Sequence, residues 1–289
     1  MTTQRYDRAR EDLGNIVHLE HINIMQPDQS VATLFYVVGL GLTRDPYLMV
    51  GLENMWINAG RSQFHLPTGG AQVLRGRIGL VLPGLEAARR RLDKVAKPLA
   101  GTAFGFSDHA DFIDATCPWG NRFRLHGPAP EFGAATLALA YVEFDVPAGA
   151  APGIARFYRD VLGAPAVLSA QGGAQAATVT VGNVQRLIFR ETSTAPAPYD
   201  GHHIQIYVAD FSGPHAALLA RGLITEESNA HQYRFKDLVD PDSGRKLFEI
   251  EHEVRSVTHP LYARELVNRN PHQSNIDYAR NCDRYTGVY

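Results

Sequence analysis

The chain has 289 residues, of which 45% are hydrophobic and 20% charged, and this composition is ordinary for about two globular domains with full cores. Its net charge of -2 provides no strong attraction to nucleic acid or to an anionic membrane surface. The longest apolar runs have the length of a strand, far short of the roughly 20 residues that span a bilayer. We therefore exclude nucleic-acid-binding and membrane-spanning proteins, and we expect a small molecule as the partner.

The N-terminal residues and the cysteines indicate the cellular compartment. The first ten residues are polar and mixed in charge, which is not the pattern of a secretory signal. Two cysteines, Cys117 and Cys282, are too few for a disulfide framework. We expect a cytoplasmic protein.

An internal repeat runs through the chain. Residues 35–41 and 157–163 both fit Phe-Tyr-x-x-x-Leu-Gly, and they lie 122 residues apart. A second pair of matching turns contains Pro118 and Pro241, which lie 123 residues apart. Two landmarks in the same order at nearly the same offset indicate a tandem duplication.

The repeat sets the predicted domain boundaries. We expect an N-terminal arm at 1–15, a first domain at 16–128, a second domain at 137–254 and a C-terminal tail at 255–289. The Pro-, Gly- and Ala-rich stretch 127–135 is the expected connector. The tail has too few apolar residues for its own core, so we expect it to wrap a domain or to cross to a partner subunit, as in a homo-oligomer. A lid over the site is a weaker alternative.

The alternation of apolar residues predicts the same elements twice. In chain order, the first half predicts strand 17–25, helix 28–38, strands 42–46, 55–58, 62–66 and 77–82, helix 85–95, and strands 111–115 and 121–125. The second half predicts strand 138–146, helix 153–161, strands 176–181, 186–190 and 203–208, helix 211–221, and strands 232–237 and 246–251. Asp28 is the expected N-cap of the first helix, and Gly39 and Gly41 are expected to end it. The fold class is therefore α+β, with a pair of β-α-β-β-β modules in each half.

The strand at 203–208 carries unusual chemistry for a core strand. His203, Gln205 and Tyr207 share one face, while the opposite face is aliphatic. The last strand of this half places Glu249 and Glu251 on one face. A histidine strand and a glutamate strand that face one cavity are the beginning of a metal site.

The chain resembles tandem members of the vicinal oxygen chelate superfamily, which includes glyoxalase I, bleomycin-resistance proteins and extradiol dioxygenases. The resemblance rests on residues 18–24, the two Phe-Tyr-x-x-x-Leu-Gly elements, residues 203–210, and the Asp-Pro-Asp-Ser-Gly turn at 240–244 that leads to Glu249. It implies that the two modules of each half curl into one cup-shaped mixed sheet. Many reactions share this fold, so the resemblance does not choose among them.

The resemblance implies metal ligands on the first and last strands of the modules, typically two histidines and a carboxylate. His203 precedes Asp210 by seven residues, as His21 precedes Asp28. Glu249 follows Gly244 by five residues where the family usually has four, so Glu251 competes with it.

The third module lacks a histidine at the matching position. Alignment through the helix brings Glu143 opposite His21, and a two-residue insertion would bring Tyr141 there instead. In the second module, Arg77 and Arg124 stand near ligand positions, where they would repel a cation and could hold an anion. The first domain is therefore expected to be a degenerate cup or one that is rebuilt for anions.

These observations predict a metal-dependent enzyme, either dioxygenase-like or glyoxalase-like, that acts on a catecholic or α-hydroxycarbonyl substrate. The expected ligands of a divalent Fe²⁺, Mn²⁺ or Zn²⁺ ion are His203, Glu249 and Glu143. The expected proton carriers are Tyr207 and Glu251, and the expected substrate contacts are His21, His65, Tyr141 and Gln205. The alternative is a non-catalytic small-molecule-binding protein of the resistance type.

Overall fold

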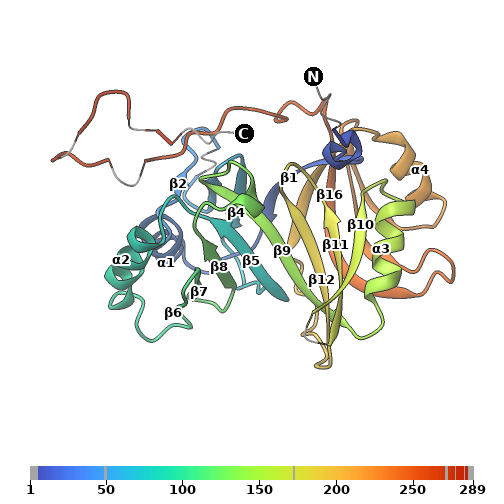
Figure 1. Cartoon of the computed structure of the whole chain (residues 1–289), viewed down its shortest axis with the longest axis horizontal. Helices are drawn as coiled ribbons and strands as arrows, with labels where there is room; N and C mark the ends of the chain where they lie inside the picture. Colours follow the sequence, from blue (N-terminus) through green and yellow to red (C-terminus); the bar gives the residue numbers. More distant parts are fainter. Residues whose placement is uncertain are drawn as a thin grey trace, which may run out of the picture.

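The computed structural model describes residues 6–48, 51–171, 173–270, 273–276, 278–282 and 284–285. Four β-α-β-β-β modules follow one another (Figure 1). After η1 (Arg8–Glu11), the first module contains β1 (Ile16–Asn23), α1 (Gln29–Thr33), the π-helix η2 (Leu34–Gly39), β2 (Thr43–Arg44), β3 (Asn54–Ala59) and β4 (Ser62–Pro67). The second contains β5 (Gly76–Val81), α2 (Leu85–Ala96), β6 (Gly105–Asp108), β7 (Phe112–Thr116) and β8 (Arg122–His126).

The second half repeats this order after the short helix η3 (Pro130–Phe132). The third module contains β9 (Ala138–Pro147), α3 (Ala151–Asp160), β10 (Ala166–Gln171), β11 (Ala174–Thr180) and β12 (Arg186–Thr192). The fourth contains β13 (His203–Val208), α4 (Ser212–Leu219), β14 (Ile224–Asn229), β15 (Gln232–Val239) and β16 (Lys246–Ser256). In the described part of the chain, no helix has both the length and the apolar character needed to cross a bilayer.

The α+β fold class and the repeated modules are confirmed. Asp28 caps α1 as predicted, because its side chain accepts hydrogen bonds from the backbone N–H groups of Ser30 and Val31. The sequence patterns missed β6, β10 and β14, which all lie at sheet edges. Edge strands need no continuous buried face, so alternation is weak in them; β14, for example, is mostly exposed.

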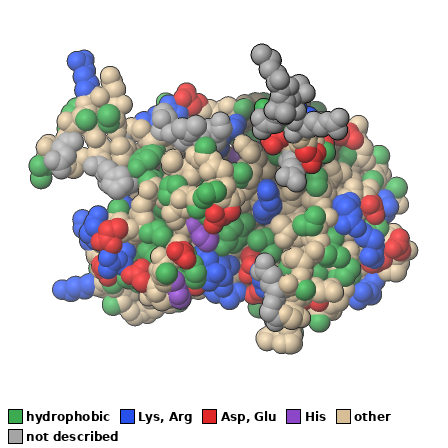
Figure 2. Space-filling view, in the orientation of Figure 1, with side chains coloured by type: hydrophobic (Ala, Val, Ile, Leu, Met, Phe, Trp, Pro, Cys, Tyr) green, Lys and Arg blue, Asp and Glu red, His purple; other side chains and the backbone are tan. Residues whose placement is uncertain are grey.

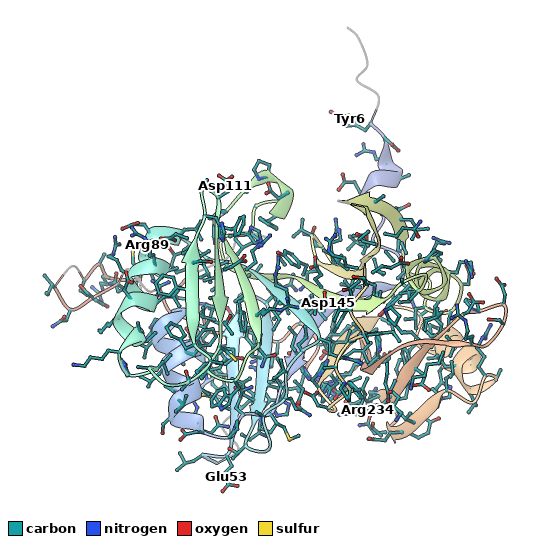
Figure 3. The ribbon with its side chains drawn as sticks, turned by 90° about the horizontal axis from the view of Figure 1, so that it is seen from below. Tyr6, Glu53, Arg89, Asp111, Asp145 and Arg234 are labelled. Atoms are coloured by element: carbon teal, nitrogen blue, oxygen red, sulfur yellow. The ribbon has the colours of Figure 1, made fainter. Side chains whose placement is uncertain are left out.

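The pairing of the modules differs from the expectation. The first sheet has the order β14-β15-β16-β13-β1-β4-β3-β2, and the second has β10-β11-β12-β9-β5-β8-β7-β6. The fourth module therefore pairs with the first, through antiparallel β13 and β1, and the third pairs with the second, through β9 and β5. Each cup-shaped sheet is thus shared between the two halves of the chain. Figure 3 separates the two sheets, with the green and yellow strands above the blue and orange ones.

The two modules of each half, in contrast, pack against each other through aromatic side chains and form one lobe of the molecule. Phe123 of the second module packs against Tyr36 and Phe64 of the first, with ring centroids 5.9 Å apart in both pairs. In the second half, Phe248 of the fourth module lies 5.8 Å from Phe144 of the third. The helices cover the outer flanks of these two lobes (Figure 1), and acidic and basic side chains are mixed over the face shown in Figure 2. The aliphatic faces of the strands thus fill the lobes, and the polar faces are left for the cups.

The C-terminal tail lies against the first module. The Arg264 guanidinium donates to Asp45, with 2.6 Å between Nη2 and Oδ2, and Asp45 is fully buried. The Asn268 amide donates to the Gly60 carbonyl oxygen at 2.8 Å and accepts from the Gly60 N–H at 3.1 Å. Of the two expected positions for the tail, the structure supports wrapping of a domain.

The turn between β3 and β4 provides a test of how closely the first module packs against the residue that precedes β9. A methyl group at Gly60 would lie 2.1 Å from the Leu137 carbonyl oxygen, and the φ angle of Gly60 is +73°. Gly51 has nearly the same φ, +71°, but faces open space. We expect Gly60→Ala to lower the free energy of unfolding by about 3 kcal/mol and Gly51→Ala by about 1 kcal/mol, as measured by urea denaturation. Equal losses would contradict the close contact with Leu137.

The buried pair of Tyr158 and His252 predicts a pH dependence. Burial lowers the pKa of His252 to about 4, and its Nε2 lies 2.6 Å from the Tyr158 hydroxyl. An unfolded histidine titrates near 6.5, so the unfolded chain binds this proton first and stability is lost as the pH falls from 6.5 towards 4. Between pH 7 and pH 5 this group should cost about 2 kcal/mol. In urea denaturation, the free energy of unfolding of His252→Gln should fall by correspondingly less between pH 7 and pH 5. An equal fall in both proteins would contradict the view that burial of His252 causes the pH dependence.

Candidate metal centre

The concave face of the first sheet carries two polar rows that cross three strands. His21 of β1, Gln205 of β13 and Glu253 of β16 are paired in one row. Asn23, His203 and Glu251 form the next row. Strand alternation turns these side chains into the cup, while Ile22, Ile204 and Val254 point into the core. In Figure 3, Arg234 lies where the blue strands of the first module meet the orange strands of the fourth.

Three potential metal ligands converge in these rows. Ligand atoms of His21, His203 and Glu253 lie within 4.8 Å of one another, and all three residues are buried. The Nε2 atoms of both histidines are buried without a hydrogen-bond partner. A buried ring nitrogen without a partner is costly unless something else binds it. Two imidazoles and one carboxylate are a ligand set that suits Fe²⁺, Mn²⁺ or Zn²⁺, so the residues fit a divalent metal.

Glu20 orients the imidazole ring of His21. The pairing of β1 with β13 shifts between Leu19 and His21, so Glu20 lies at an irregularity in the strand. His21 Nδ1 lies 2.5 Å from Glu20 Oε2. Burial raises the pKa of Glu20, but His21 and Arg255 outweigh burial and hold it below its usual range. An ionised carboxylate only accepts, so His21 Nδ1 donates to Glu20, and Nε2, which has no hydrogen-bond partner, is the ring atom left for a metal.

Two arginines hold the carboxylates of the cup. Arg234 donates to both Glu251, at 2.5 Å, and Glu253. The Arg255 Nη2 atom lies 2.6 Å from the second oxygen of Glu253. The His203 ring is close to both glutamates, with 3.6 Å from Nδ1 to Glu251 and 3.7 Å from Nε2 to Glu253. Burial lowers the pKa of His203 well below its ordinary value, so this ring is neutral and able to bind a metal at neutral pH.

His65 and Trp56 form an aromatic wall beside the cluster. Their rings stack with centroids 3.9 Å apart, and Trp56 meets His21 edge to face at 5.0 Å. Both nitrogens of His65 are occupied, by the side chains of Asn23 and Asn54 at 2.5 Å each. Burial lowers the pKa of His65 to about 3. His65 therefore lies in the cup as a neutral wall residue and has no ring nitrogen to offer a metal.

Two of the expected ligands lie elsewhere. Glu249 pairs with Lys246 at 2.7 Å and with Lys236 at 3.2 Å, which is the ordinary behaviour of a partly exposed carboxylate. Glu143 lies on β9 of the other sheet and pairs with Arg190 at 3.0 Å. The structure therefore does not bring His203, Glu249 and Glu143 together; His203 lies instead beside His21 and Glu253, because the sheets join the first module to the fourth.

The second cup has a different chemistry. Arg124 donates two hydrogen bonds of 2.8 Å to Asp114, so its fork is already filled by a carboxylate. The Tyr141 hydroxyl lies 3.0 Å from His126 Nε2, and burial raises the pKa of Tyr141 to about 12. Tyr141 therefore belongs to the second cup, on a different sheet from His21. Among the described residues, the cluster in the first sheet alone brings three potential metal ligands together.

The remaining expected residues flank the cluster. Gln205 is fully buried beside His21, and neither its amide oxygen nor its amide nitrogen has a partner. Glu251 is held by Arg234 at the rim of the cluster. Tyr207 lies one row further along β13, opposite His18, and faces a separate cavity.

Sequence reasoning missed Glu253, Glu20 and the two arginines. Glu253 was missed because the last strand was predicted to end at 251, whereas β16 continues to Ser256. The signal was present, since the alternation of glutamates with apolar residues from Glu249 to Val254 is unbroken except at His252. Glu20 could not be found from alternation, because its position depends on the irregular pairing of β1.

The sequence matches no family model and no curated protein. Among solved structures, glyoxalase I from Zea mays superposes with a TM-score of 0.57 at 13% identity, over 87% of this chain and 95% of that one. A single-substitution variant of the same maize enzyme superposes with a TM-score of 0.59 at 13% identity, over 83% of this chain and 92% of that one. A Bacillus subtilis protein described as a candidate dioxygenase gives 0.56 at 13% identity, over 85% and 86%. With the two cup-shaped sheets, these likenesses show that the chain shares the tandem β-α-β-β-β fold of these structures.

Proposed function

We propose that this protein is a metal-dependent enzyme that holds one divalent cation with His21, His203 and Glu253 and acts on a small substrate with two adjacent oxygens. One observation carries the proposal: two buried imidazole nitrogens without partners converge with a carboxylate from a third strand. Two histidines and a carboxylate favour Fe²⁺, although Mn²⁺ and Zn²⁺ accept the same ligands. The fold likeness to maize glyoxalase I supports a small-molecule site in the cup.

A bound cation would supply Lewis acidity towards the two substrate oxygens, and with iron it would also supply a site for dioxygen. The chain's own residues prepare this position. Glu20 keeps the proton on His21 Nδ1, and Arg234 and Arg255 orient Glu253. The Gln205 amide, buried without a partner, is placed to hydrogen-bond a substrate oxygen. Glu251 lies 3.6 Å from His203 and, at the rim, is the carboxylate placed to accept a substrate proton.

A second candidate is a non-catalytic protein that binds a small molecule without a metal. The ion pairs of Glu253 with both Arg234 and Arg255 favour it, because they neutralise the carboxylate that a cation would need. A metal-binding measurement separates the two functions.

The metal centre predicts a specific pattern of loss. We expect about one Fe²⁺, Mn²⁺ or Zn²⁺ ion per chain after loading, measured by elemental analysis after desalting. His21→Ala, His203→Ala and Glu253→Gln should each lower the metal content at least tenfold, since each removes one of three ligands. Glu249→Gln is the matched control, because this residue lies on the same strand but pairs with lysines. Negligible metal in the unsubstituted protein, or an equal loss in the control, would remove this proposal.

The reaction is tested separately with the Fe²⁺-loaded protein. We expect oxygen uptake with a catechol, and Glu251→Gln should lower kcat about 100-fold with little change in KM, because it removes a general base but no metal ligand. Glu249→Gln should keep full activity. Conversion of an α-hydroxycarbonyl compound without oxygen uptake would instead assign the centre to isomerase chemistry.

A further inference from the structure

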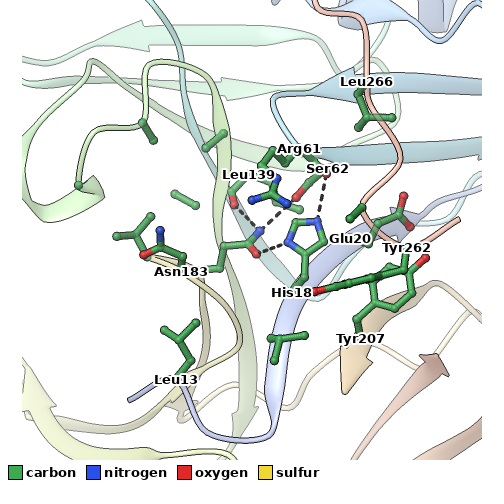
Figure 4. Close-up of a pocket in the computed structure, with 18 of the residues that line it drawn as sticks. Leu13, His18, Glu20, Arg61, Ser62, Leu139, Asn183, Tyr207, Tyr262 and Leu266 are labelled. Carbon is green, nitrogen blue, oxygen red and sulfur yellow. Dashed lines mark hydrogen bonds between the residues drawn. The ribbon is translucent and has the colours of Figure 1, made fainter. Parts of the chain in front are cut away.

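A cavity of about 480 Å³ lies beside the metal-ligand cluster but does not include any of its three ligands. Its walls come from β1, the β3–β4 turn, the end of the connector and the start of β9, the turn at 183–185, Tyr207 of β13 and the tail at 261–266. It therefore lies where the two sheets and the tail meet (Figure 4). The volume is in the range of about 300–1,000 Å³ that is typical of small-molecule sites.

The wall of this cavity is tightly built. The Gln185 side chain donates to the carbonyl oxygens of Leu19 and Leu139, at 3.0 Å each, and its own oxygen lies 2.9 Å from the His18 ring. This one amide joins β1 to β9, that is, the first sheet to the second. Beside it, Val184 has a φ of +56°, a left-handed conformation that is strained for a β-branched residue. Such strain is often retained at functional sites, where the surroundings hold it.

One end of the cavity is polar and contains the hydroxyl group of Tyr207. Tyr207 is buried and lines the cavity, and no group accepts its hydroxyl proton. The Arg255 guanidinium beside it can only donate, so the hydroxyl proton still has no acceptor. Tyr262 closes this end from the tail, with its ring 4.9 Å from that of Tyr207. Burial raises the pKa of Tyr207 to about 12, so the hydroxyl keeps its proton at neutral pH.

Apolar side chains make up much of the remaining wall of the cavity. Leu13, Val17, Phe132, Leu139 and Leu266 contribute side chains to its wall. A ligand for this space needs a compact hydrocarbon body and one oxygen that accepts the Tyr207 proton. Arg61, Arg264 and Glu20 also line the cavity, so its wall carries both positive and negative charge.

We propose that this cavity is a second small-molecule site, which takes a compact apolar molecule with one hydrogen-bond acceptor oxygen, such as an aryl ketone or an aryl carboxylate. Glu20 connects this cavity to the metal-ligand cluster, since it lines the cavity and also accepts a hydrogen bond from His21 Nδ1. A ligand here therefore touches the residue that orients a metal ligand. Only this coupling rests on the proposed function; binding in the cavity does not.

The experiment uses metal-free protein and three probes of similar size: acetophenone, benzoate and toluene. Titration calorimetry should give a Kd below about 1 mM for at least one of the two oxygen-bearing probes. Tyr207→Phe should weaken the binding of that probe about three- to tenfold, which is the loss of one hydrogen bond, and leave any toluene binding unchanged. Ala134→Trp fills the cavity from an exposed position in the connector and should abolish binding of every probe, whereas Ala134→Ser should not.

Failure of both oxygen-bearing probes to bind at 10 times that concentration would overturn the site. Binding that survives both Tyr207→Phe and Ala134→Trp unchanged would place the probe elsewhere and would also overturn it. Because no metal is present, these outcomes are independent of the metal-binding test. In the metal-loaded protein, a bound probe should shift the metal affinity, and Glu20→Gln should remove that shift.

Discussion

The antiparallel pairing of β1 with β13 is the interaction on which the site depends. It places His21 beside Gln205 and Asn23 beside His203, although these residues are about 180 positions apart in sequence. The aliphatic faces of both strands are buried in the lobes, so a slip of one residue would turn the polar face into the core. The same burial that stabilises the sheet therefore fixes the register that brings two imidazoles together.

The cup combines acidic and basic side chains in a small, largely buried space. Glu20, Glu251 and Glu253 contribute three carboxylates, and Arg234 and Arg255 contribute two guanidinium groups. A buried carboxylate is costly unless it is paired, so each of these glutamates lies beside an arginine. The arginines therefore hold the glutamates in place around the two histidines.

Much of the fold could be predicted from the sequence, but the composition of the site could not. Alternation located β13 to the residue and most of the interior strands, because each has one continuous buried face. It failed at β6, β10 and β14, where an edge position relaxes that requirement. His203 was found because a histidine on an otherwise apolar strand is conspicuous. The partnership of His203 with His21 depends on which modules pair across the halves, and a repeat with four similar modules fits either pairing equally well.

Sharing each sheet between the two halves also affects how the chain is made. During synthesis at roughly 5 to 20 residues per second, β13 emerges from the ribosome roughly 10 to 40 s after β1. Until then β1 has β4 on one side and an open edge on the other, and an unpaired edge is a site of misassociation. The first lobe can bury its aromatic core during this interval, but its cup cannot close. The nascent protein is therefore most vulnerable to aggregation before the fourth module emerges.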